Sequence, residues 1–142
     1  MIGLTTNEVQ MFVNNLTVID FSYLDKVRGI VGESWIVDLI LTGRRDEQGM
    51  VMDFGLVKKN IKKFIDDKVD HTLLVPTKLK NLYISADKTT VKFSTIKGDI
   101  FYQAPIQATS FIDSGEITKN SVSKLLQQSL QETIPDNIIN IK

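Results

Sequence analysis

The sequence predicts a single α+β domain in which two helices cover one face of an antiparallel sheet. Three observations lead to this prediction. Two early segments carry strand patterns, two later segments carry helical periodicity, and short strands separated by turn residues lie between the helices. The chain has 142 residues, of which 42% are hydrophobic and 24% charged, so its length and composition suit one domain, residues 1–142.

The first two elements are strands. Residues 13–22 are rich in β-branched and aromatic side chains, as is typical of a strand. The segment that begins at Trp35 alternates with period two, so that every second side chain up to Leu41 falls on one apolar face. Asp38 and Thr42 fall on the other face.

A helix follows the polar turn of residues 43–49. The carboxylate of Asp53 can accept the free amide groups of a first helical turn, and the pattern ends near Asp67. The apolar stripe consists of Phe54, Val57, Ile61, Phe64 and Ile65. The opposite face carries Lys58, Lys59, Lys62 and Lys63, which we interpret as a solvated surface, with anion binding as the alternative.

Short strands and a second helix complete the pattern. Residues 82–85, 90–94 and 100–103 read as strands of a hairpin or small meander, because turn residues separate them. A second helix is predicted, with Thr118 or Asn120 as its cap, and a last strand begins at residue 137. The apolar face of this helix carries Val122, Leu125, Leu126 and Leu130.

Composition excludes several kinds of chemistry. The chain has no cysteine, so it has neither a disulfide framework nor a thiolate metal site, and its one histidine is His71. The charges of the 17 basic and 17 acidic residues cancel, which argues against binding of nucleic acid or an anionic membrane through the net charge of the protein. Local patches of positive charge are still compatible with this total. We expect a cytoplasmic protein with no nucleic-acid or membrane partner.

Several blocks together resemble the 6-pyruvoyltetrahydropterin synthase and 6-carboxytetrahydropterin synthase family. The similarity covers roughly residues 13–76 and 117–142, and no single block would suffice. The blocks are Trp35-Ile36-Val37-Asp38-Leu39-Ile40-Leu41-Thr42-Gly43, Gly49-Met50-Val51-Met52-Asp53-Phe54-Gly55, Lys58-Lys59, Asp70-His71-Thr72-Leu73-Leu74-Val75-Pro76 and Ile117-Thr118-Lys119-Asn120-Ser121-Val122.

The resemblance implies the tunnelling fold, in which subunits join edge to edge into a barrel with active sites at their interfaces. It therefore implies a homo-oligomer, such as a hexamer, and a pterin-like small molecule as ligand. Residues 77–116 correspond to a strand-rich elaboration found in longer members. The last strand is expected to be cut short at Lys142, before the glutamate that anchors the ring in the family.

The family holds a catalytic zinc ion with three histidines, and the resemblance places Asp25, Val31 and Glu33 at those three positions. Valine cannot ligate a metal, and two carboxylates alone make a weak site. We therefore expect no cofactor here and favour structural roles for the two carboxylates over metal binding. The family's catalytic cysteine would fall at Val27, so it is absent as well.

The resemblance makes Asp70 and His71 the candidate catalytic residues, because the family uses this pair for proton transfer. An aspartate in a turn beside a histidine bonded to the backbone is the structural alternative. Thr118 and Glu33 are the candidate ligand-binding residues, although Thr118 also suits a helix cap. Lys119 and Asn120 depart from the usual family residues at this helix start.

Three functional hypotheses follow. The preferred one is a divergent family member of pterin- or queuosine-type metabolism, with a degenerate zinc site, that binds a pterin- or purine-like heterocycle or serves as a structural or regulatory subunit. The second is an active carbon–oxygen lyase on 7,8-dihydroneopterin triphosphate. A third is a metal-independent enzyme that uses Asp70, His71 and Glu33 for acid–base steps.

Overall fold

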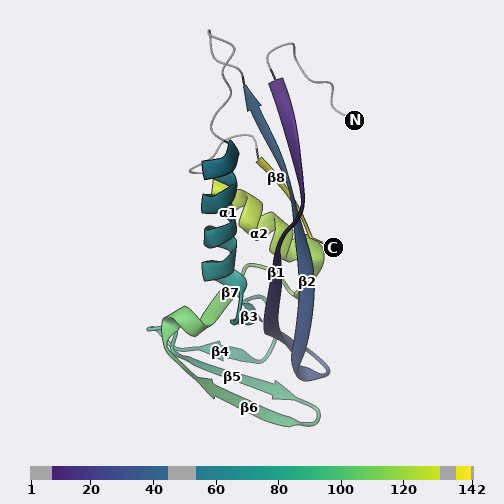
Figure 1. Cartoon of the computed structure of the whole chain (residues 1–142). Coiled ribbons are helices and arrows are strands. Elements are labelled where there is room, and N and C mark those ends of the chain that lie inside the picture. Colours follow the sequence, from purple (N-terminus) through teal and green to yellow (C-terminus); the bar gives the residue numbers. More distant parts are fainter. Residues whose placement is uncertain (1–7, 45–53, 132–136, 142) are drawn as a thin grey trace.

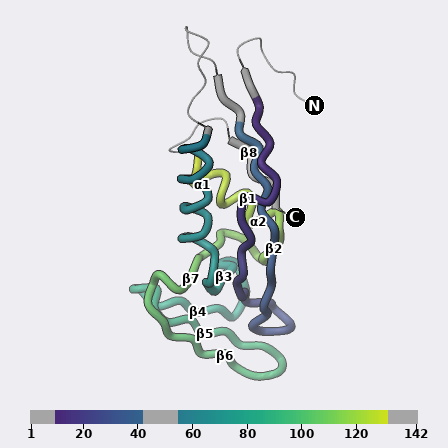
Figure 2. Tube along the Cα trace, viewed as in Figure 1, coloured from purple at the N-terminus to yellow at the C-terminus, as the bar shows by residue number. Residues whose placement is uncertain are grey.

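The computed structural model describes residues 8–44, 54–131 and 137–141, and Figures 1 and 2 show how its strands and helices are arranged. Two helices lie on one side of a long hairpin, and a smaller sheet lies at one end of the molecule (Figure 1). The helical segments are α1 (Phe54–Val69), the short 3₁₀ turn η1 (Ile106–Ala108) and α2 (Lys119–Gln131). The strands are β1 (Glu8–Asp25), β2 (Gly29–Arg44), β3 (Leu73–Pro76), β4 (Leu82–Ile84), β5 (Thr90–Thr95), β6 (Gly98–Gln103), β7 (Thr109–Ile112) and β8 (Asn137–Ile141).

The larger sheet has the order β7-β3-β1-β2-β8. β1, β2 and β8 are antiparallel, as predicted, and β1 and β2 both extend beyond the predicted segments. The sheet is nevertheless mixed, because β3 runs parallel to both β1 and β7. β3 and β7 were not predicted as strands. Each has four residues, and β3 is buried throughout, so it offers no alternating pattern.

A β-bulge interrupts β1 between Val13 and Thr17. Asn15 adopts a left-handed conformation there, with φ of 55°, and its N–H donates to the Asp38 carboxylate at 2.8 Å. Asp38 is only 5% exposed. The carboxylate is buried on this second face of β2 because it holds the bulge of β1.

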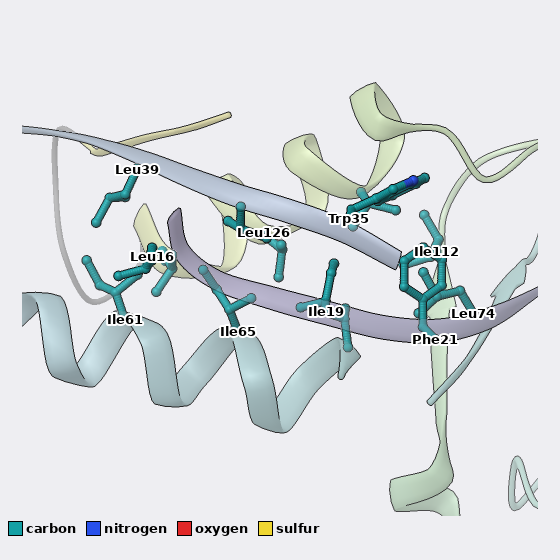
Figure 3. Packing of buried hydrophobic residues seen from close by; sticks show 14 of the residues in the cluster. Leu16, Ile19, Phe21, Trp35, Leu39, Ile61, Ile65, Leu74, Ile112 and Leu126 are labelled. Carbon is teal, nitrogen blue, oxygen red and sulfur yellow. The ribbon is translucent and has the colours of Figure 1, made fainter. Parts of the chain in front are cut away.

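The main core lies between the sheet and the two helices (Figure 3). The predicted alternation of the second strand is confirmed, since Trp35, Val37, Leu39 and Leu41 are all buried. Helix α1 ends at Val69, two residues later than predicted, and its lysine face is exposed as expected. The helices contribute Ile61, Ile65 and Val69 from α1 and Val122, Leu126 and Leu130 from α2.

A second, smaller core lies under the three-stranded sheet β4-β5-β6. This sheet is the predicted meander, with both strand pairs antiparallel. Val91 and Phe93 point inward and pack with side chains from the larger sheet. These are Leu24, Leu73 and Val75.

Helix α2 begins where the sequence predicts, and its cap is Thr118. The Thr118 hydroxyl accepts the N–H of Ser121 at 3.0 Å, as an N-cap does. The predicted cap at Asp53 lies outside the described residues. In the described part of the chain, neither helix has the length and apolar character needed to cross a membrane.

Candidate functional site

The turn after α1 holds Asp70 and His71 against the middle of β1. Asp70 Oδ1 accepts the N–H of Asp20 at 2.8 Å, and the carbonyl of Asp20 accepts the N–H of His71 at 2.7 Å. His71 adopts φ of 56°, which is the left-handed region. The backbone clamp therefore holds His71 in a conformation that a non-glycine residue seldom adopts.

The imidazole of His71 lies beside its carboxylate neighbour and faces outward. His71 Nε2 is 3.4 Å from Asp70 Oδ2, and the imidazole side chain is 78% exposed whereas that of Asp70 is 19% exposed. A half-buried carboxylate beside Nε2 can orient the accessible imidazole, which leaves the other ring nitrogen, Nδ1, to hold or move a proton.

An open hollow of about 450 Å³ lies beside this imidazole. Its wall at β1 carries Asp20, whose carboxylate accepts the Ser34 hydroxyl. Its wall at β6 carries Tyr102, whose hydroxyl accepts that of Thr109 at 3.0 Å. Ser22, Thr72, Leu73 and Ala108 also line it. Together with Phe21, these residues give the hollow polar and apolar walls in about equal measure, and its volume can admit a small molecule.

Asp25 lies in the tight turn that joins β1 to β2. Its Oδ2 accepts the N–H of Arg28 at 2.8 Å and the N–H of Val27 at 3.0 Å. The N–H of Arg28, with further contributions from Val27 and the Arg28 guanidinium, holds the pKa of the Asp25 carboxyl below its usual range. The carboxylate thus stabilises the turn.

The guanidinium of Arg28 folds back over the same turn. Its Nη2 donates to the hydroxyl of Tyr23 at 2.7 Å, and its Nε lies 3.7 Å from Asp25 Oδ2. Tyr23 is paired in register with Val31. The positively charged guanidinium of Arg28 therefore lies near Asp25 and Val31, two of the positions at which the resemblance places zinc ligands.

Glu33 is exposed and lies farther along β2. Glu33 is paired with Phe21, whereas Asp25 is paired with Gly29. Glu33 is therefore four residues beyond the partner of Asp25. This separation is about 13 Å along β2. A zinc ion takes ligands at about 2 Å. Asp25, Val31 and Glu33 do not form such a set, and the described residues contain no cluster of three or more histidine, cysteine, aspartate or glutamate side chains that could hold a metal.

The structure brings together only some of the predicted site residues. Asp70 and His71 form one contact pair, whereas Asp25 and Glu33 are separated along the β1–β2 hairpin. Thr118 caps α2, and a different cavity, of about 350 Å³, borders this helix at Asn120. Within one subunit these groups do not share a single pocket.

Sequence reasoning missed Asp20 and Arg28. Asp20 is 50 residues from Asp70 in the chain, and no local pattern indicates that its backbone receives the turn after α1. Arg28 could have been found from its spacing, because an aspartate three residues before an arginine in a tight turn can pair with it.

Comparison with known proteins identifies the family. The model of the 6-pyruvoyl tetrahydropterin synthase family matches residues 14–136. The chain belongs to this family. Among curated relatives, the 6-carboxy-5,6,7,8-tetrahydropterin synthase of Rickettsia conorii is 28% identical over 105 residues, covering 63% of this chain and 76% of that protein. The Rickettsia felis enzyme of the same name is 36% identical over 52 residues, covering 36% of this chain and 38% of that protein.

Solved structures of this family have the same fold. A catalytic-residue mutant of Plasmodium vivax 6-pyruvoyltetrahydropterin synthase superposes with a TM-score of 0.70 at 17% identity, covering 95% of this chain and 91% of that one. The Plasmodium falciparum synthase gives a TM-score of 0.64 at 16% identity, covering 96% and 99%. The predicted α+β tunnelling fold of the subunit is therefore confirmed.

Proposed function

We propose that this protein is a divergent member of the family, in pterin- or queuosine-type metabolism, that binds a pterin- or purine-like heterocycle without zinc. The observation that carries the proposal is the Arg28 guanidinium, 3.7 Å from Asp25 and hydrogen-bonded to Tyr23. The guanidinium lies beside Asp25, the position at which the resemblance places a zinc ligand.

The charges at this turn support a metal-free site. Arginine is always protonated in proteins, so the guanidinium repels a dication beside it. The Oδ2 of Asp25 already accepts two backbone N–H groups, which occupies the lone pairs of that oxygen. The Arg28 side chain is 60% exposed, so its remaining N–H groups can donate to ring or carbonyl oxygens of a heterocycle.

The Asp70–His71 pair supports a second candidate, the carbon–oxygen lyase reaction on 7,8-dihydroneopterin triphosphate. In that candidate the half-buried Asp70 orients the imidazole through Nε2, and His71 Nδ1 holds or moves the proton. The zinc ion of the family would supply Lewis-acid polarisation of the substrate, and the donor set at Asp25, Val31 and Glu33 does not favour it.

Assembly as a homo-oligomer is part of the proposal. β7 and β8 end the larger sheet on its two sides, so each offers an edge to a second copy. The face of the sheet opposite the helices also exposes paired apolar side chains, Val18 at 52% and Ile36 at 42%. An edge-to-edge barrel would pair the edges and shelter this face. It would also let the exposed His71 approach a site on a neighbouring subunit.

A thermal-shift panel tests the proposed ligand class. Neopterin, biopterin and guanine are added to metal-free wild-type protein, and we expect at least one to raise the melting temperature. Arg28→Ala should abolish that shift, whereas Lys26→Ala, which removes an exposed cation from the same turn, should retain it. Absence of a shift with every heterocycle would count against the proposal.

A further inference from the structure

A row of three side chains crosses the outer face of the small sheet. Tyr83 on β4 is paired with Lys92 on β5, and Lys92 is paired with Phe101 on β6, so the three lie side by side on one face. Tyr83 is 55% exposed and Phe101 is 64% exposed. Two large aromatic side chains are thus exposed together on this face.

The lysine is positioned between the two aromatic rings. Lys92 Nζ lies 5.6 Å from the Tyr83 ring centroid and 5.8 Å from the Phe101 centroid, within the range of cation–π attraction. The row thus places one positive charge between two exposed ring surfaces.

The opposite face of the same sheet fixes the row in place. Val91 and Phe93, the neighbours of Lys92 in β5, are buried at 0% and 3% exposure. They pack against the second core cluster together with partly buried side chains on β4 and β6. These are Leu82, Ile84, Ile100 and Tyr102.

Positive charge is concentrated around this sheet. Residues 78–103 contain five lysines and two aspartates, and one of these lysines, Lys78, lies 3.5 Å from Asp113 outside this range, whereas the complete chain has equal numbers of basic and acidic residues. The balanced total therefore hides a basic region, and the expectation of no nucleic-acid partner was based on that total alone. Aromatic rings combined with basic side chains are how proteins bind single-stranded nucleic acid.

We propose that the row Tyr83–Lys92–Phe101 binds a short single strand of nucleic acid, with bases stacked on the two rings and a phosphate near Lys92. The three strands span roughly 15 Å by 20 Å, or about 300 Å². A stable dimer needs about 800 Å² on each partner, so this face alone is too small for one. The proposal is independent of heterocycle binding at the β1–β2 turn.

Fluorescence anisotropy with labelled ten-nucleotide oligo(dT) and oligo(U) at low salt tests the proposal on the full chain. We expect binding by wild type and a loss of roughly five- to hundredfold in affinity for Tyr83→Ala and for Phe101→Ala. Lys92→Ala should lower the slope of log affinity against log salt by about 0.7, the value for one phosphate on a single strand.

Matched controls separate this surface from general effects. Leu56→Ala removes a 57% exposed apolar side chain on α1, and Lys58→Ala removes an exposed lysine there, so both should bind like wild type. Thermal melts verify that every variant is folded. Three results would overturn the proposal: no binding of either oligonucleotide, equal binding of a duplex, or oligomerisation that Phe101→Ala abolishes.

Discussion

The backbone of Asp20 and the side chain of Asp70 are joined across 50 residues of chain by a 2.8 Å hydrogen bond. The Asp20 carbonyl also accepts the N–H of His71 at 2.7 Å, so β1 fixes the turn after α1 at two points. These two hydrogen bonds fix the position of the His71 backbone, from which the imidazole projects. They tie the candidate catalytic pair to β1, the longest strand in the described part of the chain.

Removal of the Asp70 carboxylate should loosen this clamp. We expect Asp70→Ala to lower the free energy of unfolding by about 1–2 kcal/mol, because the N–H of Asp20 loses its partner. His71→Ala removes only a mostly exposed imidazole and should change stability by less than about 0.5 kcal/mol. Urea denaturation measures both, and equal stability of Asp70→Ala and wild type would contradict the clamp.

The buried carboxylate of Asp38 should contribute to stability, although it lies on the face of β2 opposite the main apolar face. Asp38→Ala leaves the N–H of Asn15 without its acceptor at the bulge, and we expect a loss of about 2 kcal/mol in urea denaturation. Asn15→Gly is the matched control. Glycine suits φ of 55°, so this variant should stay within about 1 kcal/mol of wild type. A larger loss for Asn15→Gly than for Asp38→Ala would be inconsistent with this role.

The core between α1, α2 and the sheet should be sensitive to truncation. Leu126 on α2 is fully buried, so Leu126→Ala should cost about 2–5 kcal/mol through lost burial and a cavity. Leu56→Ala makes the same chemical change at a 57% exposed position on α1 and should cost less than about 0.5 kcal/mol. Thermal or urea unfolding of the two variants gives the comparison, and similar losses would contradict the packing.

Acid should weaken the β1–β2 turn through Asp25. Its pKa in the folded state lies below the value in the unfolded chain, mainly because the N–H of Arg28 donates to the carboxylate. The ionised carboxylate therefore stabilises the fold above about pH 4, and this contribution is lost as the pH falls through the lowered folded-state pKa. Unfolding free energies of wild type and Asp25→Asn should differ at pH 7 and converge below pH 4. A difference independent of pH would show that ionisation of Asp25 does not stabilise the turn.

The elements that could be predicted from the sequence are those with a regular spacing of apolar residues. The alternation from Trp35 and the stripe through Ile61 and Ile65 indicate a strand and a helix, and the structure confirms both. β3 escaped prediction because it is short and buried on all sides. The burial of Asp38 could not be predicted, because alternation does not distinguish a solvated carboxylate from a buried one that holds a bulge.

The candidate site was predictable where its residues are adjacent in the sequence. Asp70 and His71 follow each other, so their pairing could be anticipated, and the structure places them 3.4 Å apart. The support from Asp20 and the contact between Arg28 and Tyr23 depend on which strands pair and how the turn folds. Those contacts arise from tertiary structure, which local patterns do not encode.

Zinc stoichiometry combined with ligand binding tests the central claim most directly. The protein is incubated with zinc, freed of excess metal, and measured by plasma mass spectrometry, and heterocycle affinity is then measured by calorimetry with and without a chelator. We predict well under one zinc ion per chain and the same affinity in both conditions. One tightly held zinc ion per chain, together with turnover of 7,8-dihydroneopterin triphosphate, would contradict the claim.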